Sequence, residues 1–356
     1  MRRVERSGHM IKLRHFQDSD ESGRLPGTHD VPTPSLAAQE NATLDESSVI
    51  EPVLPEMAVN LCRAKAPVRV PLADSRIVTA ESSPSFVRHV TFDMRGTPLA
   101  GRLKAGQSFG IIPPGTDADG RAHKLRLYSV SSPSDGEDGQ GRLVSTLVKR
   151  VVEERPETHR LYLGVCSNFL CDLQPGDEVA MTGPAGKRFL LPSEPERFNY
   201  VFFATGTGLA PFRAMTMDLL RAGIEVPVHL LVGVPYRTDY MYHDLFERVA
   251  RERSNFSYRP VVSREARRQD GAKHYVHYAI GEDETLRATL AQPNTLIYVC
   301  GIKDMEWSIY RELLQVGLDG YITLRHPPVG KHPLDYTREE FRRHVRAGPR
   351  MFLEVY

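Results

Sequence analysis

The sequence feature that most constrains the fold is a glycine-rich turn between an apolar run and a helical pattern. The run Tyr200–Ala204 is followed directly by TGTGLAP, which places Gly206 and Gly208 in the turn and Pro211 just after it. A short apolar run is typical of a strand that is buried on both faces, and proline favours the first turn of a helix. These residues therefore predict a strand–turn–helix unit of a parallel α/β sheet.

Two patterns divide the rest of the chain. After residue 200, strands and helices alternate, with strands predicted at 228–234, 256–263 and 295–301 and helices near 211–220, 243–253, 282–291 and 305–316. Between residues 68 and 191, short alternating runs separated by Gly and Pro clusters predict an antiparallel barrel or sandwich. We predict a two-domain β plus α/β protein, with a β-barrel domain over 61–195 and a Rossmann-like parallel-sheet domain over 196–356.

Residues 1–60 have a different composition. They are rich in Pro, Ser and Thr, acidic residues outnumber basic ones, and no hydrophobic period is sustained. Such a segment buries too little apolar surface to offset its ordering entropy, so we predict a disordered N-terminal extension. No apolar run has the length of a secretory signal core or of a membrane span.

Charge and cysteine content exclude further classes of protein. The 46 Lys+Arg and 45 Asp+Glu residues nearly balance, which argues against a nucleic-acid-binding protein. Cys166 and Cys171 have the spacing that opens a plant-type iron–sulfur motif, but the third cysteine is missing. The four cysteines are too few and too scattered for a disulfide framework. We predict no metal site, reduced thiols and a cytoplasmic protein.

The glycine turn is a candidate nucleotide site. Backbone N–H groups at a helix N-terminus can bind a pyrophosphate, although TGTGLAP lacks the full G-x-G-x-x-G spacing and a plain tight turn remains an alternative. No acidic residue stands at the end of the second strand, Val234-Pro235, where NAD-binding folds place a ligand for the ribose 2′-hydroxyl. Asp239 follows a few residues later.

Three other clusters suit nucleotide chemistry. Arg126 and Tyr128 share one face of a predicted strand and offer a guanidinium and a flat ring, as a flavin nucleotide requires, although an ordinary surface strand would look similar. The small residues of GVCSNFL could surround a diphosphate. A hydroxyl, two cations and an aromatic side chain suit a ribose 2′-phosphate and its adenine, unless they form a solvated basic loop: Ser263, Arg264, Lys273 and Tyr275.

Seven ordered stretches together resemble the plant-type ferredoxin–NADP⁺ reductases. They are GQSFGIIPPGTDADGRAHKLRLYSVSS, GVCSNFLCDLQPGDEVAMTGPAGKRFLLP, FATGTGLAPFRAM, LLVGVP, VVSRE, YVCGIKDME and the terminal EVY. The resemblance covers about Val68 to Tyr356. It implies an FAD-binding barrel, an NADP-binding α/β domain and electron transfer between NADP(H) and a one-electron carrier, either ferredoxin or flavodoxin.

The resemblance also implies roles for individual residues. The implied FAD ligands are Arg126, Leu127, Tyr128, Ser129, Gly164, Val165, Cys166, Ser167, Thr207 and Tyr356. The implied NADP ligands are Lys149, Thr205, Gly206, Gly208, Ser263, Arg264, Lys273, Tyr275, Cys300 and Gly301. The implied catalytic residues are Ser129, Cys300, Glu354 and Tyr356, with Glu354 bonded to Ser129 and Tyr356 covering the flavin. The implied docking surface for an acidic carrier contains Lys124, Leu125, Leu127 and Lys187.

The sequence departs from the family pattern at several places. Glu153 stands where the family usually has a tyrosine that stacks on the FAD adenine, and Ala185 replaces a larger aliphatic residue of the docking patch. The segment 320–350 is longer than the usual family ending. Two other functions stay open at this stage: the NADPH-dependent reductase component of an oxygenase system, and a non-catalytic nucleotide-sensing flavoprotein.

Overall fold

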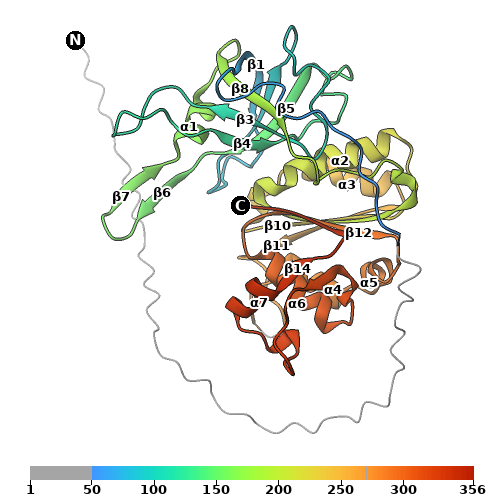
Figure 1. Ribbon diagram of the computed structural model, residues 1–356. Coiled ribbons are helices and arrows are strands. Elements are labelled where there is room, and N and C mark those ends of the chain that lie inside the picture. Colours follow the sequence, from blue (N-terminus) through green and yellow to red (C-terminus); the bar gives the residue numbers. More distant parts are fainter. Residues whose placement is uncertain (1–49, 270) are drawn as a thin grey trace, which may run out of the picture. The chain divides into compact units, whose positions relative to one another are not determined.

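The computed structural model describes residues 50–269 and 271–356, and two sheets dominate it (Figure 1). One sheet is antiparallel, with strand order β4-β3-β8-β1-β2-β5, and the other is parallel, with order β11-β10-β9-β12-β15. The antiparallel strands are β1 (Val68–Ile77), β2 (Val87–Asp93), β3 (Ser108–Ile112), β4 (Arg126–Ser129), β5 (Leu143–Lys149) and β8 (Glu178–Ala185). The parallel strands are β9 (Asn199–Thr205), β10 (Val228–Val234), β11 (Phe256–Val262), β12 (Thr295–Gly301) and β15 (Met351–Val355). The predicted fold class is confirmed.

The antiparallel sheet curves so that its two edge strands meet. The Ser131 amide, just past β4, donates to the Ser145 carbonyl on β5 at 2.8 Å. The Thr146 hydroxyl donates to the Ser129 carbonyl at 2.7 Å. These bonds close the sheet into the predicted barrel, and closure removes the exposed edges that would otherwise invite pairing with another chain.

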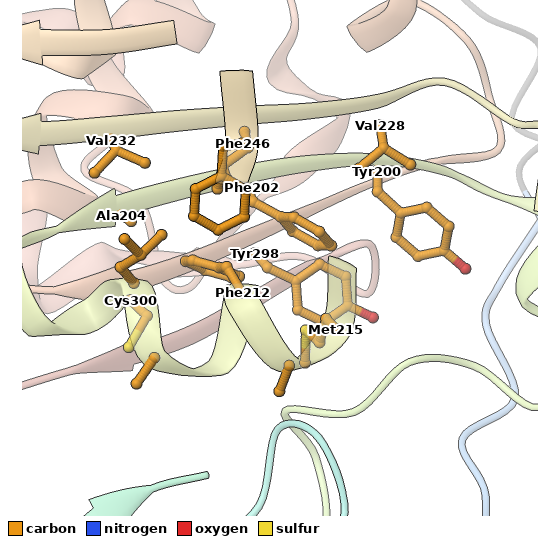
Figure 2. Packing of buried hydrophobic residues seen from close by; sticks show 14 of the residues in the cluster. Tyr200, Phe202, Ala204, Phe212, Met215, Val228, Val232, Phe246, Tyr298 and Cys300 are labelled. Atoms are coloured by element: carbon orange, nitrogen blue, oxygen red, sulfur yellow. The ribbon is translucent and has the colours of Figure 1, made fainter. Parts of the chain in front are cut away.

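The parallel sheet separates two apolar layers, as expected for strands that are buried on both faces. Along β9, Tyr200 and Phe202 point to one layer, while Val201 and Phe203 point to the other. In the first layer, Phe202 stacks on Phe212 of helix α2 (Leu209–Arg221), with ring centroids 4.9 Å apart (Figure 2). The alternation of side chains along each strand therefore supplies a core to both sets of helices.

Helices cover both faces of the parallel sheet (Figure 1). One face carries α2 (Leu209–Arg221) and α3 (His243–Glu252), and the other carries α4 (Ala279–Glu282), α5 (Glu284–Leu290) and α6 (Met305–Gln315). The other α-helices are α1 (Val165–Asp172) and α7 (Arg338–His344). The other strands form the hairpin β6–β7 (Val152–Arg155 and Arg160–Leu163) and the two-stranded antiparallel sheet β13–β14 (Ile322–Leu324 and Val345–Ala347). No helix among the described residues is long and apolar enough to cross a membrane.

The long segment 320–350 builds an additional layer beside α6. It contains the paired strands β13 and β14, with α7 between them in the chain. Phe341 of α7 is buried, and its ring centroid lies 4.6 Å from that of Trp307. Arg338 and Arg342 of α7 both form ion pairs with Asp304, which precedes α6. The segment therefore packs on α6 and returns the chain to β15.

The predicted N-terminal extension lies mostly outside the described residues. Its part from 50 to 60 contains no helix or strand, but Val53 accepts a hydrogen bond from the Ser193 amide and the Asn60 amide donates to Pro184, each at 2.8 Å. Ala58 accepts a bond from the Gln107 side chain at 3.2 Å. This short stretch is therefore bonded to the barrel domain and to the segment that follows it.

A buried ion pair joins α2 to the barrel. Arg213 donates through Nη1 to Glu137 Oε1 at 2.7 Å and through Nη2 to Glu137 Oε2 at 3.1 Å, and Nη1 also reaches the Ser131 carbonyl at 2.7 Å. The guanidinium lies 4.9 Å from the centre of the Tyr242 ring. Because the pair is largely removed from water, each charge depends on the other for its solvation.

Replacing Arg213 with alanine is expected to lower the free energy of unfolding by about 2–4 kcal/mol, because Glu137 would remain buried without its partner. Arg221→Ala is the matched control on the same helix. Arg221 pairs with Asp135, but both side chains are more than 40 % exposed, so a loss below about 1 kcal/mol is expected. Urea unfolding measures both values, and equal losses would contradict the role assigned to burial.

Candidate functional site

Many of the predicted site residues of the α/β domain lie where the parallel strands end. β9, β10, β11, β12 and β15 all run in one direction, so their carboxyl ends share one edge of the sheet. Ligands of open α/β sheets bind outside this edge. Residues predicted from four separate stretches of sequence, from Thr205 to Tyr356, lie at or just beyond it.

The glycine turn after β9 is shaped by close contacts with β12. Gly206 has a φ of +52°, in the left-handed region. A side chain at Gly208 would overlap the Cys300 carbonyl, and one at Gly301 would overlap the Thr205 hydroxyl. This turn, Gly206–Gly208, is a 3-10 helix that continues directly into α2. The side chain of its cap residue, Thr205, accepts no hydrogen bond from it, so the first amides of the turn are available to an anionic group.

The C-terminal residue is anchored through its backbone while its ring remains accessible. The Tyr356 amide donates to the Gly301 carbonyl at 3.0 Å, and the Lys303 amide donates to the Tyr356 carbonyl at 2.9 Å. The Tyr356 hydroxyl lies 2.8 Å from Thr207 Oγ1, and the residue is 62 % exposed. The ring can therefore leave its position at the loss of one hydrogen bond, without unpairing the strand.

Glu354 connects the two sheets. Its Oε2 accepts a hydrogen bond from Ser129 at 3.4 Å, as predicted, and its Oε1 accepts one from Ser108 at 3.2 Å. Burial raises the pKa of Glu354, although both serine hydroxyls partly oppose the shift. This carboxyl group is therefore suited to hold a proton beside the barrel.

Cys300 lies directly opposite Glu354 in the β12–β15 ladder and is fully buried. Burial raises the pKa of its thiol well above the usual value, so the thiol is neutral at physiological pH. A neutral, small side chain at the strand end leaves room for a flat ring without adding charge.

A groove of about 470 Å³ lies over the barrel. Seven predicted FAD ligands line it: Arg126, Leu127, Tyr128, Gly164, Val165, Cys166 and Ser167. The predicted docking residue Lys124 also lines it. The other predicted FAD ligands, Ser129, Thr207 and Tyr356, are not part of the groove lining. Ser129 is hydrogen-bonded to Glu354, and the hydroxyl groups of Thr207 and Tyr356 are hydrogen-bonded to each other. The sequence patterns did not single out Arg121, His123 and Tyr162, which also line it; the rest of the lining is Pro113, Asp117, Ala122 and Val151.

The groove fits a dinucleotide diphosphate. α1 begins there after Gly164, and this cap contributes no side-chain acceptor, so the first-turn amides stay available. A side chain at Gly164 would crowd Ser167 Oγ at 2.7 Å and Val151 Cβ at 2.8 Å. Arg121, Lys124 and Arg126 add positive charge to the same groove. Cations and free amides at a helix N-terminus are the donors that a diphosphate requires.

Ser263 and Arg264, two of the four residues predicted for a 2′-phosphate, lie just beyond β10 and β11. The Ser263 amide donates to Val234 at 2.9 Å and the Arg264 amide donates to Pro235 at 3.0 Å, so the two strands stay paired past their ends. This pairing sets Arg264 Nη1 3.3 Å from the Tyr236 hydroxyl. Arg264 is exposed, so its guanidinium remains accessible to a phosphate.

Tyr236 and Asp239 were not assigned roles from the sequence. Tyr236 follows the end of β10, where only an acidic residue was sought. Asp239 is buried and accepts hydrogen bonds from the Ser83 hydroxyl and the Tyr236 amide. Its carboxylate is therefore used inside the structure and is not presented to a ribose 2′-hydroxyl.

The remaining predicted ligands are placed less directly. Lys273 is exposed in the loop beyond β11, where its backbone forms an isolated antiparallel β-bridge with that of Arg267. Tyr275 is 41 % exposed, and its ring stacks beside that of His277. Lys149 ends β5, a strand that contacts the 206–208 turn. In the docking set, Leu127 is 60 % exposed, Lys187 is exposed and Leu125 is half-buried.

Comparison with known proteins gives the family. The family described as "Oxidoreductase NAD-binding domain" matches residues 202–310. A ferredoxin–NADP reductase from Picosynechococcus is 36 % identical over 330 residues, which cover 90 % of this chain and 78 % of the relative. The chain belongs to the ferredoxin–NADP reductase family. A Synechocystis reductase is 33 % identical, with 98 % of this chain and 86 % of the relative covered.

Solved structures agree on the fold of this reductase. The ferredoxin–NADP⁺ reductase from Plasmodium falciparum matches with a TM-score of 0.61 at 22 % identity, covering 83 % of this chain and 99 % of that one. A variant of the same enzyme in complex with 2′P-AMP gives a TM-score of 0.62 at 21 % identity, with 84 % and 99 % covered. The family resemblance predicted from the sequence is confirmed, and the family's cofactors are FAD and NADP.

Proposed function

We propose that this reductase binds FAD in the barrel groove and moves electrons between NADP(H) and the one-electron carrier ferredoxin. The observation that carries the proposal is the position of Glu354. It lies on the last strand of the parallel sheet, one residue from the nucleotide edge, and is hydrogen-bonded to Ser108 and Ser129 of the barrel. One side chain therefore connects the two predicted cofactor sites.

The FAD site is assigned to the barrel domain, over 61–195. Arg126 and the first amides of α1 bind the diphosphate, while Tyr128 and Tyr356 pack against the flavin ring system. Ser129 donates to the flavin edge and Glu354 holds a proton close to it. Burial raises the pKa of Tyr128 far above its usual value, so the phenol remains a neutral stacking partner.

The NADP site is assigned to the α/β domain, over 196–356. The glycine turn and α2 bind the diphosphate, Ser263 and Arg264 bind the 2′-phosphate, and Tyr275 packs against the adenine. Cys300 and Gly301 border the nicotinamide. When bound, a flavin would accept one hydride, that is, two electrons, and would release the electrons one at a time. The protein positions the reactants, supplies protons and excludes water.

The assay for the proposed function uses the full-length chain. NADPH should reduce cytochrome c when ferredoxin is added, and Glu354→Gln should lower turnover by roughly tenfold or more, because the proton donor is lost. Ferredoxin and flavodoxin tested side by side identify the carrier. If NADPH reduces neither carrier but reduces an oxygenase component, the proposed carrier is wrong. The four free, buried cysteines support the cytoplasmic location that we propose.

Docking of an acidic carrier predicts a dependence on salt. Lys124 and Lys187 are exposed, and so is the apolar Leu127. We expect kcat/KM for ferredoxin to fall roughly tenfold between low salt and about 0.5 M salt, because long-range attraction is screened. Reduction of a neutral quinone is the control and should change little. Lys187→Glu should lower the ferredoxin rate at low salt, and a rate that is independent of salt would contradict this docking surface.

A further inference from the structure

The hairpin β6–β7 places an aromatic side chain in the groove beside the α1 N-terminus. Tyr162 lines the groove and is 42 % exposed, and it stands two residues before Gly164, where α1 is capped. Two tyrosines line the groove: Tyr128 on β4 is adjacent to Ser129 and thus to Glu354, whereas Tyr162 lies on the hairpin that projects from the barrel (Figure 1). The groove therefore offers a flat ring on the hairpin, apart from the one beside the flavin residues.

The cross-strand register explains how Tyr162 enters the groove. Glu153 and Tyr162 are directly opposite in the β6–β7 ladder, so their side chains share one face of the hairpin. Glu153 is exposed and is not part of the groove lining. Position 153 carries no aromatic side chain. The neighbouring strand supplies one, Tyr162, on the same face of the hairpin.

Arg155 adds a second contact to this ring. Its guanidinium carbon lies 5.3 Å from the centre of the Tyr162 ring, within the range of a cation–π interaction. Tyr162 lines the groove and Arg155 does not, so of these two side chains it is the ring that the groove presents to a planar group.

We propose that Tyr162 stacks on the adenine of FAD, in place of a residue at position 153. This inference rests on the proposed function, because it requires FAD in the groove. With the flavin beside Tyr128 and the diphosphate at the start of α1, the adenine is the remaining planar group of the dinucleotide, and Tyr162 adjoins the start of α1. Stacking of a base on an aromatic side chain uses the flat face of the base and needs no fixed hydrogen-bond partner.

The test compares FAD with FMN, which lacks the adenine, in the full-length chain. FAD release from the holoprotein is followed by flavin fluorescence after dilution, and the flavin-depleted chain is titrated with each flavin. Tyr162→Ala should weaken FAD about 5- to 100-fold, as expected for loss of one base–aromatic stack, while FMN affinity changes by less than about twofold.

Three variants make the result specific. Tyr162→Phe keeps the ring and should retain FAD within about twofold. Leu161→Ala, on the opposite face of the hairpin and 67 % exposed in the native chain, should leave both flavins unaffected. Adding Glu153→Tyr to Tyr162→Ala should recover most of the lost FAD affinity, because the two positions share a face.

Two outcomes overturn the inference and are distinguishable from each other. If Tyr162→Ala binds FAD as tightly as the native chain, or loses FMN and FAD equally, Tyr162 does not contact the adenine and the proposed function still stands. If the native chain retains neither flavin, the proposed function fails and the adenine site fails with it.

Discussion

Arg264→Ala is expected to weaken NADPH binding about 10- to 100-fold while NADH binding changes less than about twofold. A hydrogen bond between a guanidinium and a phosphate contributes about 1.5–3 kcal/mol, and NADH has no 2′-phosphate to receive it. The pairing of Ser263 and Arg264 with the end of β10 fixes the backbone at this position. The loss should therefore come from the missing guanidinium and not from a displaced loop.

Two further variants define the origin of that effect. Tyr236→Phe removes the hydroxyl that lies 3.3 Å from Arg264 Nη1 and should give a smaller loss of NADPH affinity, about two- to fivefold. Arg251→Ala on α3 is the matched control, because Arg251 is 70 % exposed and pairs only with Glu247 among the ion pairs of the described residues. Steady-state KM values and titration of the reductase with 2′P-AMP report both effects. Equal weakening of NADPH and NADH by Arg264→Ala would show that Arg264 does not bind the 2′-phosphate.

Tyr356→Ser is expected to tighten NADP⁺ binding by at least about tenfold and to let NAD⁺ compete. The ring occupies the end of the β12–β15 edge, and under the proposed function it has to move away before nicotinamide can enter. Entry costs one hydrogen bond to Thr207 and the ring's packing against the flavin, together on the order of 1–3 kcal/mol. Serine removes this cost while the backbone bonds to Gly301 and Lys303 keep the terminus in place.

Thr207→Val is the matched control for this effect. It removes only the 2.8 Å contact with the Tyr356 hydroxyl and should tighten NADP⁺ less than about fivefold. Titration of the oxidised reductase with NADP⁺ and with NAD⁺ gives the affinities, and turnover with NADPH should fall as product release slows. Unchanged affinity and unchanged preference in Tyr356→Ser would exclude the ring as the barrier to nicotinamide.

The fold was largely predictable because its patterns are local. The run at β9 and the turn at Gly206 and Gly208 carry their own conformational requirements: burial on both faces, a positive φ and close approach to β12. The switch from alternating runs to strand–helix alternation near residue 195 likewise follows from hydrophobic period alone. These features do not depend on which distant segment packs against them.

Contacts between distant segments were not predictable from pattern alone. Ser108 shares Glu354 with Ser129, yet SFGII contains no sign of a partner 246 residues away. Asp239 stood close enough to the β10 end to suggest a ribose ligand, and only its burial beneath Ser83 shows otherwise. The role proposed for Tyr162 depends on strand register, which a sequence does not fix for a short exposed hairpin.

The most direct test of the account is an anaerobic titration of the full-length reductase with NADPH, followed through the visible absorption of the flavin. The account predicts a yellow protein with one FAD per chain whose absorption is bleached by NADPH, and far less effectively by NADH. A chain that stays colourless after incubation with FAD, or a flavin whose absorption NADPH leaves unchanged, would contradict it.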